Sequence, residues 1–134
     1  MRASMPAMPR DAYGLPVTTG AASALEAYDR AVEGLLGWDA RALDLFRRAA
    51  AEDPGFALAH AGAAVCLFLE ERFAEAREAA KAARAAAGAQ TERERRHVEA
   101  LALLVEGKMG DAEQAMREHL WEASSRRARR CLAR

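Results

Sequence analysis

The sequence has few aromatic residues, cysteines and prolines, and no surplus of either charge. Aromatic side chains make up 6% of the 134 residues, with two cysteines, four prolines, and 20 Lys and Arg against 20 Asp and Glu. Two cysteines do not make a disulfide framework and favour a reducing compartment, so a cytoplasmic location is expected. Balanced charge argues against a nucleic-acid partner held by bulk charge.

Long apolar runs are also absent. No stretch of the sequence is long enough to cross a bilayer, and residues 1–16 lack the apolar core of a secretory signal. No membrane partner is therefore expected.

Alanine-rich segments with apolar residues at helical spacing fill most of the chain. Short breaks separate them at Gly37, Asp53-Pro54-Gly55, Gly88 and Gly107. A capping box of Thr91 and Glu94 starts the fifth segment. The predicted helices cover roughly 21–36, 39–52, 56–70, 73–87, 92–106 and the region from about 111 onward.

Small residues recur along these segments with a period of a tetratricopeptide repeat. Ala42, Ala76 and Ala112 are 34 and 36 residues apart, and Gly37 aligns with Glu71 and Gly107. Small side chains let the two helices of a hairpin cross closely. One departure is Arg30, which stands at the small crossing position of the first helix.

This period predicts an all-α fold, a tetratricopeptide-type superhelix of three antiparallel helical hairpins. The repeats are expected at about 21–54, 55–88 and 91–123 within a repeat domain of residues 19–123. A disordered or extended lead-in, 1–18, precedes it, with Met1 to Arg10 disordered and Tyr13, Leu15 and Val17 packed on the first helix. A basic tail without an apolar face, 124–134, follows it and is expected to be disordered, with an extension of the last helix as the alternative.

Three stretches, 11–19, 51–60 and 91–100, carry a more specific resemblance. Together they resemble bacterial relatives of tetratricopeptide repeat protein 38 over about residues 11–120. The resemblance implies a long helical solenoid without a settled biochemical activity. It also implies further hairpins after about residue 120, so the chain looks like a truncated member, one with an altered reading frame, or a genuine short form.

Residues capable of chemistry are present but do not form a site. No two of His60, His97 and His119 lie within a helical turn, and Cys66 has no cationic neighbour to support a thiolate. A cluster of acids is interleaved with Arg72 and Arg77, as on a solvated helix face. No catalytic residue, metal site or cofactor is expected. The acids are Glu70, Glu71, Glu75 and Glu78.

The expected function is a protein–protein interaction scaffold that binds a protein or peptide. Chaperone tails are not the expected ligand, because Ala27, Ala31, Gly62 and Cys66 stand where a carboxylate clamp needs Lys and Asn. The alternative is an assembly subunit that forms a homodimer through an uncapped C-terminal hairpin. The candidate interaction residues are Leu101, Leu104, Val105, Met116, Leu120 and Trp121.

Overall fold

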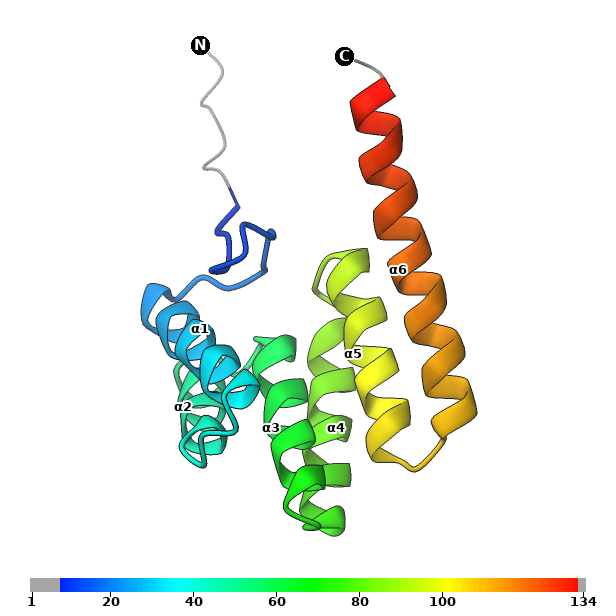
Figure 1. The fold of residues 1–134 in the computed structure, drawn as a ribbon. Coiled ribbons are helices and arrows are strands. Elements are labelled where there is room, and N and C mark those ends of the chain that lie inside the picture. The colour runs from blue at the N-terminus through cyan, green and yellow to red at the C-terminus, as the bar shows by residue number, and fades with distance from the viewer. Residues whose placement is uncertain (1–7, 133–134) are drawn as a thin grey trace.

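The computed structural model describes residues 8–132, and within them the chain forms six α-helices (Figure 1). They are α1 (Ala22–Leu36), α2 (Ala42–Glu52), α3 (Ala57–Leu69), α4 (Phe73–Ala87), α5 (Glu92–Val105) and α6 (Met109–Leu132). The described residues contain no strand, only an isolated bridge between Arg10 and Pro16. The predicted all-α fold is confirmed. The expected disorder of Met1 to Arg10 mostly concerns residues 1–7, which lie outside the described residues.

The helices pair into three hairpins, α1 with α2, α3 with α4 and α5 with α6, which stack side by side (Figure 1). The backbone of α3 lies close to those of both α1 and α5, whereas the backbones of α2, α4 and α6 do not approach one another in the described chain. The first helices of the hairpins therefore form the inner layer of the stack, and the second helices form the outer layer.

Each hairpin turn has the same geometry. Two residues after the end of each first helix, the backbone is left-handed, at Trp38 (φ 57°), Glu71 (φ 60°) and Gly107 (φ 80°). The following amide donates back to a carbonyl near the helix end, from Asp39 to Gly34, Arg72 to Leu67 and Lys108 to Leu103. This is the Schellman arrangement.

These turns correct the predicted register of the first hairpin. Trp38, not Gly37, is equivalent to Glu71, so α1 is displaced by one residue from the predicted alignment. The crossing position of α1 is therefore Ala31, which is fully buried, and Arg30 is exposed. In the outer helices the prediction is confirmed, because Ala42, Ala76 and Ala112 are all buried.

The predicted basic tail, 124–134, is helical as far as Leu132. Helix α6 continues through the arginine-rich segment to Leu132, for 24 residues. No Pro or Gly follows Gly110, Arg and Ala are strong helix formers, and Arg129 and Arg130 stand where the helix dipole favours a positive charge. None of the helices in the described chain is long and apolar enough to cross a membrane.

Candidate interaction surfaces

The inner layer carries two rows of apolar side chains at equivalent positions of α1, α3 and α5. On α3, the side chains of His60, Ala63 and Leu67 face the outer groove between α2 and α4, on the side of the helix away from the inner face. Val65 therefore lies on the inner face by helical periodicity, with Phe68 beside it. All six side chains are half-buried, and none is charged. The rows are Val32, Val65 and Leu101, then Leu35, Phe68 and Leu104.

The lead-in closes this inner face at the end where α1, α3 and α5 begin (Figure 1). Val17 is fully buried in a cluster with Phe56, Leu58 and Val98. The Arg93 guanidinium of α5 donates to the Pro16 carbonyl at 2.7 Å. The predicted packing of the lead-in holds for Val17 alone, because Tyr13 and Leu15 are exposed.

A buried carboxylate joins the lead-in to the start of α5. Glu94 is 0% exposed and accepts four hydrogen bonds. Two come from Thr91, from its backbone N–H at 3.0 Å and its hydroxyl at 2.8 Å, which confirms the predicted capping box. The other two come from Thr18, at 2.7 and 2.6 Å. The contact between Thr91 and Glu94 was predicted from their spacing in the sequence, whereas the contact between Thr18 and Glu94 was not.

The outer face has a groove of about 490 Å³ over α3, between α2 and α4. Its walls are mostly apolar, and an ion pair between Arg47 and Glu75, 3.3 Å long, spans its rim. His60 lines the groove, and its Nε2 lies 2.8 Å from the Pro54 carbonyl oxygen. This contact gives His60 a structural role at the turn before α3.

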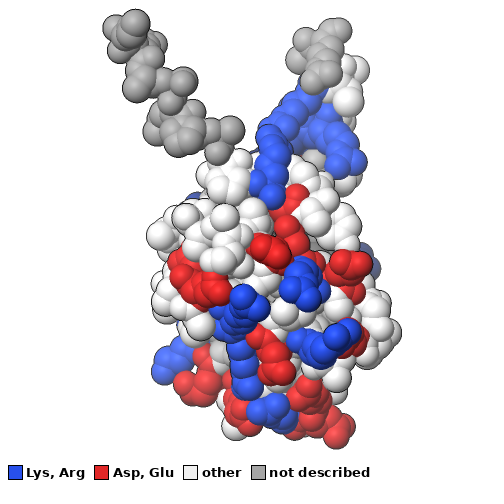
Figure 2. All heavy atoms as spheres, turned by 90° about the vertical axis from the view of Figure 1, so that its left-hand side faces the viewer, with Lys and Arg blue, Asp and Glu red and all other residues white. Residues whose placement is uncertain are grey.

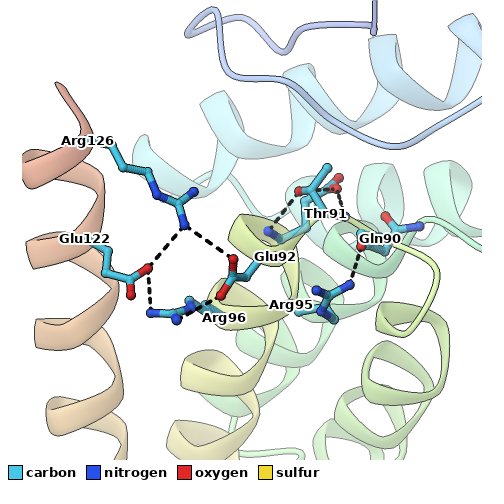
Figure 3. Close-up of polar contacts among 8 residues, drawn as sticks. Gln90, Thr91, Glu92, Arg95, Arg96, Glu122 and Arg126 are labelled. Carbon is cyan, nitrogen blue, oxygen red and sulfur yellow. Dashed lines mark hydrogen bonds and ion pairs between the residues drawn. The ribbon is translucent and has the colours of Figure 1, made fainter. Parts of the chain in front are cut away.

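Ion pairs hold α6 against α5 (Figure 3). Arg96 contacts Glu92 at 2.9 Å and Glu122 of α6 at 2.8 Å. Arg126 contacts the same two carboxylates at 3.3 and 3.5 Å. The network alternates two cations with two anions across the helix pair, and it fixes the direction in which α6 leaves the hairpin.

Below this network the structure brings together two histidines that lie far apart in the sequence. The rings of His97 and His119 are 5.7 Å apart between α5 and α6. Burial and the neighbouring His119 and Arg93 lower the pKa of His97 to about 4, and burial also lowers the pKa of His119. No group of three metal-binding side chains occurs among residues 8–132. The two histidine rings therefore pack against each other as neutral imidazoles.

The remaining reactive residues have structural surroundings. Burial raises the pKa of the Cys66 thiol to about 11, as expected for a cysteine without cationic support. In the acidic cluster, Arg72 contacts Glu70 at 3.1 Å and Glu75 at 2.7 Å. The predicted helix face is therefore a solvated cluster at the turn between α3 and α4, and Arg72 rather than Arg77 makes its ion pairs.

The six predicted interaction residues do not share one surface. Val105 is 2% exposed and lies in the core, out of reach of a partner. Leu101 and Leu104 lie on the inner face, and Met116 is half-buried. Only Leu120 and Trp121 are well exposed, at 57% and 74%, and both lie on α6. The structure therefore separates an inner face from an outer face of α6.

No protein-family model and no curated protein matches this chain. Among solved structures, it is similar to the second tetratricopeptide-repeat domain of Spaghetti (RPAP3), solved with the HSP90 peptide SRMEEVD. The two share 22% sequence identity and a TM-score of 0.52, and the match covers 75% of this chain and 92% of that one. Together with the six-helix stack and its repeated turns, this likeness shows that the chain has the tetratricopeptide-repeat fold.

Proposed function

We propose that this protein is an interaction module that binds a peptide segment of another protein along its inner face. Two apolar rows at equivalent positions of α1, α3 and α5 carry this proposal. Repeats that place the same kind of side chain at the same position build a continuous strip suited to an extended or helical ligand. The resemblance to bacterial relatives of tetratricopeptide repeat protein 38 is retained as part of this proposal.

The chemistry of the inner face favours a ligand with apolar side chains. The similar domain of Spaghetti was solved with an acidic peptide. Here the positions first compared with a carboxylate clamp are all buried: Ala27, Ala31, Gly62 and Cys66. The half-buried rows beside them contain only Val, Leu and Phe, so they offer no cation to a carboxylate.

A selection from random peptides displayed on phage tests the proposal. We expect the protein to enrich peptides rich in Leu, Ile and Phe. Val65→Lys and Leu101→Lys should each abolish their binding, because a charge would be desolvated at the centre of the strip. Ala51→Lys, on the exposed surface of α2, is the matched control and should bind as the wild type does. Binding that survives both inner-face substitutions would overturn the proposal.

The HSP90 peptide SRMEEVD provides a second test of the ligand class. We expect no binding to this chain in a titration with fluorescently labelled peptide, because the inner rows carry no cation. Saturable binding at micromolar peptide, lost on Val65→Lys, would show that carboxylates are recognised here by another route and would contradict the apolar ligand class.

A further inference from the structure

The outer face of the C-terminal part of α6 is an unpartnered amphipathic surface. The first half of the helix packs on α5 through Ala112 and His119, which are buried. Beyond Ser124 the described residues are exposed except Ser125, which is half-buried, and the helix projects past the start of α5 (Figure 1). This surface exists only because the segment is helical, which was the alternative to the expected disordered tail.

A stripe without charge runs along this face. Between Glu118 and Leu132, the uncharged residues that share the side of α6 away from α5 follow a helical spacing. Trp121 is 74% exposed, Leu120 57% and Leu132 87%. Small residues lie between the large ones, which leaves room for an opposing side chain. The stripe consists of Leu120, Trp121, Ser124, Ala128, Cys131 and Leu132.

Charge changes sign along the same helix. Its first part contains Glu113, Glu118 and Glu122 together with one arginine, Arg117. Figure 2 shows basic side chains gathered on the projecting end of the helix. On the body of the molecule the two charges are interspersed (Figure 2). Glu118 is exposed and makes no ion pair within residues 8–132, and the same holds for Arg127, Arg129 and Arg130.

This polarity fits an antiparallel copy of the same helix better than a uniformly anionic ligand. A phosphate backbone or an anionic bilayer would meet the arginines but would be repelled by Glu118, whereas Glu113 is paired with Arg117 at 2.6 Å. A second α6 running in the opposite direction places its acidic part beside the basic part of the first. The same contact is then made twice, as a two-fold interface requires.

We propose that two copies of this protein dimerise through the outer faces of their α6 helices, packed antiparallel about an axis beside Ser124. Glu118 and Arg129 lie about three helical turns apart on one edge of the stripe, at equal distances on either side of that axis. Glu118 of each copy therefore faces Arg129 of the other. Trp121 of each copy packs over Ala128 of the other. The dimer leaves both inner faces open, so it does not depend on the proposed peptide binding.

Light scattering and sedimentation velocity of the full chain test this proposal. We expect a dimer at micromolar concentration that weakens as salt rises. Glu118→Arg and Arg129→Glu should each raise the dimer dissociation constant about tenfold or more, since each removes two ion pairs and creates two repulsions. The double variant Glu118→Arg/Arg129→Glu should restore the wild-type constant. Glu33→Arg, on exposed α1, is the matched control and should change nothing.

Cross-linking locates the axis independently. In a Cys131→Ser background, Ser124→Cys should give a covalent dimer with a short thiol-specific cross-linker, whereas Glu33→Cys should not. Cys66 is buried and contributes no background. A monomer at high micromolar concentration would overturn the proposal. So would a dimer unaffected by both single charge reversals, which would place the interface on another surface, or a double variant as weak as the singles.

Discussion

Gly62 of α3 lies directly against the ring of Phe46 of α2, where a Cβ atom would stand 2.3 Å from Cε1 of the ring. Phe46 is 1% exposed, so its ring lies enclosed in the core. Alanine in place of glycine normally stabilises a helix by about 1 kcal/mol. Here the cost of overpacking exceeds the gain in helix propensity, so Gly62→Ala should destabilise the protein by about 1–3 kcal/mol in urea unfolding.

Gly88→Ala is the control for this substitution, because nothing lies within 4 Å of a Cβ built there. We expect it to be neutral or slightly stabilising. A Gly62→Ala variant as stable as Gly88→Ala would show that α2 and α3 can separate without cost.

Ala42 and Ala76 occupy the equivalent crossing positions of the first two outer helices, and they are 2% and 0% exposed. Ala→Leu at either position should push the helices of its hairpin apart at a cost of about 1–3 kcal/mol. Ala51→Leu, on the exposed side of α2, should change the free energy of unfolding by less than about 0.5 kcal/mol. Equal midpoints for buried and exposed variants would contradict the assigned register.

Trp38 adopts a left-handed backbone although its side chain is 83% exposed. A non-glycine residue pays for that conformation in strain of about 1–2 kcal/mol. Trp38→Gly should therefore raise the thermal midpoint, with a gain of about 1 kcal/mol, and Glu71→Gly should do the same. At the equivalent turn, Gly107→Ala should lower it. A loss of stability in Trp38→Gly would show instead that the indole holds the turn together.

The buried Glu94 carboxylate should be costly to neutralise. In Glu94→Gln an amide NH₂ would face some of the four donors of Thr18 and Thr91, so we expect a loss of about 2–3 kcal/mol. Thr18→Val should cost about 1 kcal/mol, because only the hydroxyl is lost. Glu92→Gln removes a neighbouring exposed carboxylate and should cost less than about 1 kcal/mol. Similar losses in the free energy of unfolding for Glu94→Gln and Glu92→Gln would contradict the strength assigned to the hydrogen bonds of Glu94.

Acid should loosen the contact between α5 and α6 through His97. Its pKa is lowered from 6.5 to about 4, so the unfolded state binds the proton more readily than the folded state. The stabilisation is present above the unfolded pKa and is lost as pH falls. Between about pH 7 and pH 5 the loss should be about 2 kcal/mol. His119, Arg93 and Arg96 oppose a positive charge there, and Glu122 acts on His119 in the opposite direction.

The variant His97→Gln isolates this effect. It should be less stable than the wild type at neutral pH but show a shallower fall in stability from pH 7 to pH 5, measured by urea unfolding at each pH. A slope identical to that of the wild type would assign the acid sensitivity to other groups.

Local patterns predicted the helices and the crossing residues, and they failed where the outcome depended on contacts across the fold. Gly37 was assigned to the first turn as a helix break 34 residues before Glu71, yet Gly37 has φ −90° and Trp38 takes the left-handed position. This single displacement explains the misassignment of Arg30. A glycine near a helix end is a weak indicator of register when its neighbour can occupy the strained position.

The C-terminal helix was expected only as the alternative to a disordered tail, and the contact between Thr18 and Glu94 was not predicted. The segment lacks an apolar face for packing on a neighbour, but Glu92 of α5 and Glu122 neutralise Arg126, and no breaking residue follows Gly110. Thr18 and Glu94 are 76 residues apart, so no local spacing could join them. The capping box nevertheless identified Glu94 as the acid at the start of α5. Because this carboxylate is fully buried, its oxygens accept hydrogen bonds from Thr18 as well as from Thr91.

The link from Thr18 to Glu94 also changes how the stack should come apart. In a solenoid each repeat touches only its neighbours, so end repeats can fray while the rest stays folded. Here the residue before the first hairpin is bonded to the third, and Val17 is buried beside residues of α3 and α5. The first hairpin cannot melt alone without uncovering the start of the last. The chain should therefore unfold as one cooperative unit, with amide protons of α1 and α5 exchanging through the same global opening.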